Sequence, residues 1–152
     1  MSSTRIVLAA ALLFCVVASP TQPQAQESRR YIAPRTPADA TQPPFSGAVQ
    51  VGNTLYLSGD IGIDENQKVP ATAEAEAQLL LESIRRTLKE AGFTMDDLVS
   101  VTVFCSDVKH YDAFNTVYRS YFKKEFPARA FIGAGTLLFN ARFEMQGIAV
   151  RR

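Results

Sequence analysis

The chain has 152 residues, of which 47% are hydrophobic and 20% are charged. This length suits a single domain, and the composition excludes disorder over most of the chain. Its 16 basic and 15 acidic residues leave a net charge of +1, which excludes the strongly basic surface typical of nucleic-acid-binding proteins. Two cysteines are too few for a disulfide-stabilised scaffold.

Residues 1–25 predict a secretory signal peptide. Arg5 precedes an uninterrupted apolar run at 6–18, and a polar segment containing prolines follows. The run is too short to span a bilayer, which takes ~20 apolar residues. A buried N-terminal helix is the alternative, but the run has no polar face for such a helix to turn to water. We therefore expect an exported protein, periplasmic or secreted, with no stable membrane anchor after cleavage.

Residues 26–42 are rich in Pro, Thr, Gln and Ala and predict a linker that becomes ordered toward its end, before one domain at 43–152. Without residues 1–25 the net charge is zero and one thiol remains, Cys105. That thiol ends a strand-like run, so we expect it to be buried and inert. His110 is the only histidine and is expected to cap a helix or to face solvent. The chain therefore offers no metal site.

The first predicted elements are two strands at 48–51 and 54–57, joined by a tight turn at Gly52 and Asn53, which both tolerate positive φ. Residues 58–64 continue the second strand and interrupt it with glycines. The clearest helix is predicted at 71–91, where apolar residues recur three and four positions apart; they are Ala73, Ala77, Leu80, Leu81, Ile84, Leu88 and Ala91. Charged residues, Glu76 among them, are expected on the rest of its surface, and Gly92 is expected to end it.

A strand at 98–105 and a second helix follow, the helix beginning at Asp107 or His110 and running to about Lys123; two closing strands are predicted at 129–135 and 142–150. This order, ββαβαββ, predicts an α+β fold in which two helices cover one face of a mixed sheet. Apolar residues occur on both faces of the closing strands, for example at Phe131, Ile132, Phe143, Met145 and Ile148. The uncovered face therefore predicts an oligomer.

Two residues carry candidate chemistry. Arg129 begins a strand between small residues, and a guanidinium can hold a carboxylate with two parallel hydrogen bonds. Glu144 lies between Phe143 and Met145, and a carboxyl group in apolar surroundings can act as a proton shuttle. Spacing alone leaves another interpretation open, in which Arg129 and Glu144 form an ion pair at the edge of the sheet.

Several motifs in the same order resemble one known family. They are GNTLYLSGDIGID at 52–64, FNTVY at 114–118, FPARA at 126–130 and FEMQGIAVRR at 143–152. The chain from about Pro43 to its end resembles the reactive intermediate imine deaminase family, called RidA, YjgF-like or endoribonuclease L-PSP. The resemblance implies a chorismate-mutase-like fold and a homotrimer with ligand sites between subunits. It also implies hydrolysis of enamines and imines, such as 2-aminoacrylate, to 2-keto acids and ammonia without any cofactor.

The resemblance assigns roles to the candidate residues. Arg129 matches the arginine that holds the substrate carboxylate, and Glu144 matches the glutamate that positions or activates water. Ser58 and Gly59 match residues that line the pocket, and Asn115 matches a helix asparagine near it. Further substrate-binding positions are Phe45 and Phe131.

The chain also departs from the family pattern. Phe45 stands where tyrosine is usual, Asp60 where glutamine is usual, and Ala130-Phe131 where serine with cysteine or threonine is usual; Gln146 replaces a second glutamate. An anion site is therefore a firmer expectation than deamination of the archetypal substrate. The alternative function is a non-catalytic trimer that binds small carboxylates or acts as a chaperone. A ribonuclease activity is disfavoured, because phosphate contacts need clustered basic residues.

Overall fold

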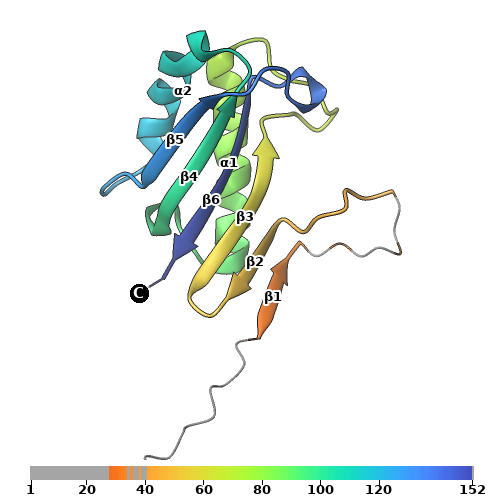
Figure 1. Cartoon of the computed structure of the whole chain (residues 1–152), viewed down its shortest axis with the longest axis vertical. Helices are drawn as coiled ribbons and strands as arrows, with labels where there is room; N and C mark the ends of the chain where they lie inside the picture. Colours follow the sequence, from red (N-terminus) through yellow and green to blue (C-terminus); the bar gives the residue numbers. More distant parts are fainter. Residues whose placement is uncertain (1–27, 34, 36–37, 39–40, 152) are drawn as a thin grey trace, which may run out of the picture.

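The computed structural model describes residues 28–33, 35, 38 and 41–151. In this part of the chain, six strands form one mixed sheet, and two α-helices pack against one of its faces (Figure 1). The expected α+β fold with two helices on one face is confirmed. The expected signal peptide at 1–25 lies outside the described residues, so export stays a prediction.

One strand precedes the predicted elements. β1 (Arg29–Ile32) pairs antiparallel with β2 (Ala48–Val51), although the sequence places it within the expected linker at 26–42. Only Ile32 of β1 is buried, and the other three residues are exposed. A four-residue strand with one buried side chain is too short to show the alternation that signals a strand.

The predicted hairpin is confirmed. β2 pairs antiparallel with β3 (Thr54–Ile61), and Val51 lies opposite Thr54 across the turn. Gly52 in this turn has a φ of 56°, in the left-handed region that favours glycine. Leu55 and Leu57 of β3 are buried toward the helices, so this face of the hairpin belongs to the core.

The first helix, α1 (Ala73–Ala91), starts two residues later than predicted because Thr72 caps it. The Thr72 hydroxyl accepts a hydrogen bond from the Ala75 amide at 3.2 Å, and Gly92 ends the helix with a φ of 82°. All seven predicted apolar residues of the helix face are buried. Each buried leucine or isoleucine there contributes about 1.5–3 kcal/mol. Glu76 contradicts the prediction of a solvated charge, because it is fully buried.

β4 (Leu98–Cys105) has the predicted bounds, and Cys105 at its end is buried, as expected. Burial raises the pKa of the Cys105 thiol, which keeps it protonated. The second helix is shorter than predicted: α2 (Tyr111–Tyr118) lies between two short 3₁₀ turns, at 108–110 and 119–121. His110 occupies the N-cap position of α2, but its side chain makes no capping hydrogen bond.

The two closing strands, β5 (Ala128–Gly133) and β6 (Phe143–Val150), are not neighbours in the sheet. The strand order is β1-β2-β3-β6-β4-β5, with β4 and β5 parallel and the other pairs antiparallel. β6 therefore lies in the middle of the sheet, and β5 lies at its edge on the side of α2 (Figure 1). This order places Glu144 on a central strand and Arg129 on an edge strand.

The face of the sheet away from the helices carries apolar side chains, as predicted. Ile132 of β5 is 43% exposed and Tyr56 of β3 is 50% exposed. A hollow on this face is lined by side chains from three strands, including Tyr56, Thr102, Gln146 and Ile148. An apolar sheet face of this kind is typical of a surface that packs against another molecule.

Candidate functional site

Arg129 on β5 lies in an aromatic environment. It pairs in register with Val101, which is buried beneath the helices, so its side chain points to the helix side of the sheet. Its guanidinium carbon lies 4.7 Å from the ring centroid of Tyr118, 5.7 Å from that of Phe131 and 5.8 Å from that of Tyr111. Cation–π contacts of this kind contribute about 0.5–2 kcal/mol each, depending on desolvation. We call Arg129 with these three rings and Asn115 the arginine site.

The arginine site contains buried polar atoms that lack partners. Among the described residues, neither Nη1 of Arg129 nor the hydroxyl of Tyr118 has a hydrogen-bond partner, although both atoms are buried. A buried donor left in this way costs about 1–3 kcal/mol. Desolvation raises the pKa of Tyr118 to about 12, although the Arg129 charge acts in the opposite direction. A small anion here would pair with Arg129, and Tyr118 would stay a neutral hydroxyl at physiological pH.

A hollow of about 130 Å³ opens on the arginine site. Asn115 and Arg129, both predicted as site residues, line it together with Tyr118. Arg119, which is exposed, adds a second positive charge to its rim. The hollow is therefore small and positively charged, which suits a small carboxylate.

The remaining predicted residues gather around Glu144 on β6. Glu144 pairs with Ile61 of β3, next to a register shift between Leu57 and Asp60. A Cβ atom on Gly59 would collide with Oε1 of Glu144, so the carboxylate in its present position lies directly against the glycine. We call Glu144, Gly59 and Ser58 the glutamate site.

Ser58 connects the glutamate site to the segment before β2. Its hydroxyl donates a hydrogen bond of 2.6 Å to the carbonyl of Ser46, and its amide donates one of 3.1 Å to the carbonyl of Gly47. Phe45, next to Ser46, is 51% exposed. The ring at position 45 is thus accessible, and its backbone lies next to the residue that Ser58 holds.

The arginine and glutamate sites lie on opposite faces of the sheet. Glu144 stands between Phe143 and Met145, both of which are fully buried beneath the helices, so its own side chain points away from them. The strands β5 and β6 are also separated by β4, a lateral distance of about 10 Å. The interpretation of Arg129 and Glu144 as an edge ion pair is therefore wrong. Within one chain, the predicted residues form two separate groups, the arginine site and the glutamate site.

The residues that depart from the family pattern fall in both regions. The Phe131 ring packs edge-on against Tyr111, with centroids 5.0 Å apart, and forms one wall of the arginine site. Oδ1 of Asp60 accepts a hydrogen bond from the Ile61 amide at 2.9 Å beside the glutamate site. Ala130 and Gln146 are exposed on the open face of the sheet.

Two aromatic residues of the arginine site were not predicted from the sequence. Tyr111 and Tyr118 follow the apolar side of α2, so their spacing indicates core residues and nothing more. Only the pairing of β4 with β5 brings the Arg129 guanidinium under this helix.

In residues 28–33, 35, 38 and 41–151, no three His, Cys, Asp or Glu side chains are grouped to hold a metal ion. No helix in this part of the chain is long and apolar enough to cross a membrane.

Comparison with known proteins finds a matching family model, similar sequences and similar structures. The family model described as Endoribonuclease L-PSP matches residues 36–151. The 2-iminobutanoate/2-iminopropanoate deaminase of Dermatophagoides farinae is 39% identical over 115 residues, which are 73% of this chain and 90% of that protein. The crystal structure of the YjgF gene product from E. coli has a TM-score of 0.72 at 30% identity, covering 81% of this chain and 99% of that one. The crystal structure of E. coli TdcF with bound serine has a TM-score of 0.70 at 27% identity, covering 73% of this chain and 91% of that one.

Proposed function

Because this chain belongs to the endoribonuclease L-PSP family, also called the RidA or YjgF-like family, we propose that it is a deaminase. It hydrolyses small 2-imino and 2-enamino acids to 2-keto acids and ammonia. The observation that carries this proposal is Arg129, which lines a small hollow and whose buried Nη1 lacks a partner in the described residues. The Arg129 guanidinium is a preformed binding site for the carboxylate that all these substrates share.

The relatives support the same substrate class. The Dermatophagoides farinae protein is named as a deaminase of 2-iminobutanoate and 2-iminopropanoate, both of which carry a carboxylate. The TdcF structure contains serine, another small molecule with a carboxylate next to a nitrogen-bearing carbon. The signal peptide predicted at 1–25 adds the proposal that this chain acts outside the cytoplasm, on imino acids present there.

The proposed reaction needs only water and a proton shuttle. The enamine tautomerises to an imine, whose carbon is electrophilic, and the Arg129 guanidinium holds the carboxylate in two hydrogen bonds. Glu144 accepts a proton from the attacking water as the C–O bond forms and returns it to the nitrogen, which gives a carbinolamine. Glu144 then takes the proton of the carbinolamine hydroxyl and delivers it to the amino group. The C–N bond breaks as the C=O bond forms, ammonia leaves, and the 2-keto acid remains. General acid–base catalysis of this kind accelerates a reaction about 10²–10⁴-fold.

Catalysis by Arg129 and Glu144 together requires two copies of the chain. The two residues point to opposite faces of one sheet, so we propose that the arginine site of one subunit meets the glutamate site of the next. The apolar residues of the open sheet face, such as Ile132 and Tyr56, support assembly through this face. The assembly proposed is the homotrimer that the family resemblance implies.

A second candidate function is carboxylate binding without catalysis. It is favoured by the separation of the two sites, because the arginine site is complete within one chain and does not need Glu144. The two functions differ in turnover and agree on ligand binding.

The test is release of ammonia and 2-keto acid from 2-iminopropionate generated in situ, with protein that lacks residues 1–25. We expect acceleration above the spontaneous rate, loss of that acceleration in Glu144→Gln, and retained affinity of Glu144→Gln for pyruvate. An oligomeric, folded protein that binds pyruvate without accelerating hydrolysis of any imino acid supports carboxylate binding instead. A protein that neither binds pyruvate nor accelerates hydrolysis contradicts both functions.

A further inference from the structure

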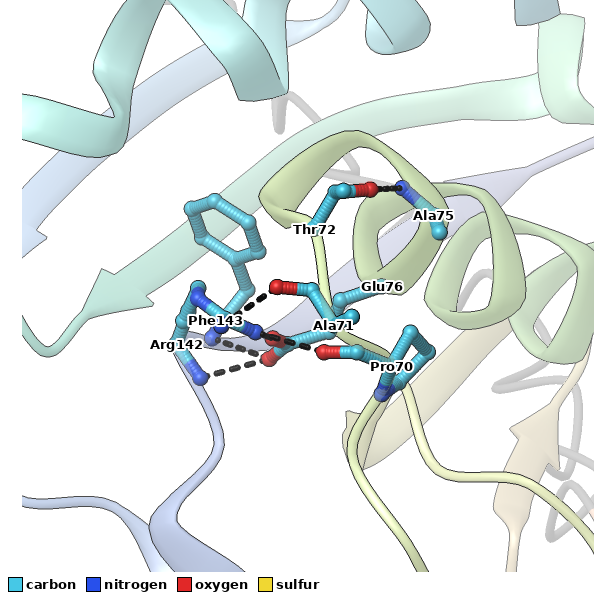
Figure 2. A network of polar contacts seen from close by, with 7 residues as sticks. All are labelled: Pro70, Ala71, Thr72, Ala75, Glu76, Arg142 and Phe143. Carbon is cyan, nitrogen blue, oxygen red and sulfur yellow. Dashed lines mark hydrogen bonds and ion pairs between the residues drawn. The ribbon is translucent and has the colours of Figure 1, made fainter.

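A buried ion pair joins the start of α1 to the start of β6. Figure 2 shows Arg142 reaching Glu76, which is completely buried in the first turn of α1. Nη1 of Arg142 donates a hydrogen bond of 2.7 Å to Oε2 of Glu76, and the same nitrogen donates one of 2.9 Å to the carbonyl of Pro70. Nη2 donates to the carbonyl of Ala71 at 3.0 Å. We call Glu76 with Arg142 the clamp.

The clamp also holds the backbone of β6. Oε1 of Glu76 accepts hydrogen bonds from two consecutive amides, that of Arg142 at 2.5 Å and that of Phe143 at 3.0 Å. The carbonyl of Arg142 accepts a further hydrogen bond of 2.9 Å from the amide of Ser106. The backbone is therefore fixed from both sides at the residue where β6 begins. Both carboxylate oxygens of Glu76 are used, so the buried charge is compensated.

The structure leaves little freedom around the clamp. A Cβ atom on Gly62 would collide with the carbonyl of Glu76, so the loop after β3 packs directly against the first turn of α1. The loop that leads into β6 contains Phe139 and Asn140, which both have a positive φ. The clamp thus stands between an irregular loop and the strand that carries Glu144.

From these contacts we propose that Glu76 and Arg142 are positioning residues for Glu144. This inference rests on the proposed function, in which Glu144 is the proton shuttle. Glu144 comes directly after Phe143, whose amide the clamp holds, and its carboxylate fits against Gly59 with no space for a methyl group. A shift of β6 by 1 Å would move the carboxylate relative to the attacking water, and displacements of that size can cost about 10²-fold in rate.

The clamp is separate from the arginine site. The arginine site is built from β5 and α2, whereas the clamp joins α1, the loop after β3 and β6. Loosening the clamp should therefore reduce kcat and leave substrate affinity nearly unchanged. A residue that only supports the overall fold would reduce the fraction of folded protein, so apparent kcat and the number of pyruvate-binding sites would fall together.

The experiment compares Glu76→Ala and Glu76→Gln with the wild type and with Glu74→Gln, a matched control at an exposed position of the same helical turn. We expect kcat to fall about 100-fold in Glu76→Ala, with KM and the Kd for pyruvate changed less than about three-fold. Glu76→Gln keeps an oxygen acceptor for the two amides and should restore most of kcat, and Glu74→Gln should match the wild type. An unchanged kcat in folded Glu76→Ala would overturn the proposal, as would equal losses in kcat and pyruvate affinity.

A second readout does not depend on turnover. In a crystal structure of Glu76→Ala, the Glu144 carboxylate should lie away from Gly59, and the Phe143 amide should exchange with solvent at least ten-fold faster than in the wild type. Glu76→Gln should keep both close to the wild type. An undisturbed Glu144 with unchanged amide exchange overturns the positioning role even if the wild type proves inactive. An inactive wild type whose Glu144 still moves in Glu76→Ala contradicts the proposed deaminase and leaves the positional coupling established. If Glu76→Ala does not fold, the same measurements on Arg142→Ala decide, since that variant removes the partly exposed side chain of the clamp and should also displace Glu144.

Discussion

The arginine site and the glutamate site are built by different means. Aromatic side chains from α2 and β5 surround the guanidinium of Arg129, so side-chain packing makes the arginine site. Backbone geometry makes the glutamate site, because Gly59 leaves room for the carboxylate and the clamp fixes the start of β6. The arginine site is built to bind the substrate carboxylate, and the glutamate site is built to hold the Glu144 carboxylate in position. Variants that affect ligand binding and catalysis separately therefore distinguish the two sites.

The largest expected effect is on the arginine site. In Arg129→Ala, kcat/KM should fall about 10³-fold or more, because two hydrogen bonds to a charged carboxylate contribute about 1.5–3 kcal/mol each. Pyruvate affinity, measured by calorimetry, should fall in parallel. Arg119→Ala, which removes the exposed charge on the rim of the same hollow, is the control and should lose far less. Similar losses in both variants would show that the positive charge of the surface, and not the Arg129 guanidinium in particular, binds the ligand.

Phe114 packs between the arginine site and Phe143 at the start of β6, so its removal should weaken the core that supports both regions. Its ring is fully buried and lies 5.5 Å from the Tyr118 ring, 5.6 Å from that of Phe131 and 4.9 Å from that of Phe143. Phe114→Ala should lower the free energy of unfolding by about 3–5 kcal/mol. Chemical denaturation measures this loss. A loss below ~1 kcal/mol would mean that the two regions do not share one core.

Gly59→Ala tests the glutamate site alone. The added methyl group would occupy the position of Oε1 of Glu144, so the carboxylate must move. We expect kcat to fall about 100-fold while pyruvate binding persists. Steady-state kinetics with a parallel binding assay checks this expectation. Loss of pyruvate binding to the same extent as kcat would mean that the substrate carboxylate binds at the glutamate site and not at the arginine site.

The smallest expected effect concerns the Tyr118 hydroxyl. Burial raises its pKa from the usual 10 to about 12, so the folded state holds a proton that the unfolded state releases above pH 10. Stability contributed in this way is fully present below pH 10 and is lost as the pH rises to about 12. Tyr118→Phe should abolish this part of the alkaline decline, as measured by denaturation from pH 9 to 12.

At neutral pH the same variant should be as stable as the wild type or up to ~1 kcal/mol more stable, because it removes a buried polar group that has no partner in the described residues. The control is Tyr121→Phe. Burial and the hydrogen bond to Glu82 also raise the pKa of Tyr121 to about 12, so part of the alkaline decline should remain in either single variant. An alkaline curve for Tyr118→Phe identical to that of the wild type would contradict the assignment of a buried hydroxyl.

Most of the elements follow from local patterns in the chain. The seven apolar residues at helical spacing in 71–91 become the buried face of α1, and the Gly52-Asn53 turn joins the first hairpin. The motifs around Arg129 and Glu144 predict both as site residues. β1 escapes prediction because only one of its side chains is buried. α2 is shorter than predicted because it passes into a 3₁₀ turn at 119–121, which ends at the extended backbone of Phe122.

The sequence by itself determined the central group of each site: an arginine among small residues, and a carboxylate between apolar neighbours. Only the tertiary structure decided how these groups are distributed and which aromatic rings surround the arginine. β6 inserts between β3 and β4, which separates Glu144 from Arg129 by one strand, and the strand register turns the two side chains to opposite faces. The fold also gives the buried Glu76 a partner 66 residues away. Helical and strand periodicity report which side of an element is apolar over a few residues. Strand order depends on contacts between distant segments, so no local pattern contains it.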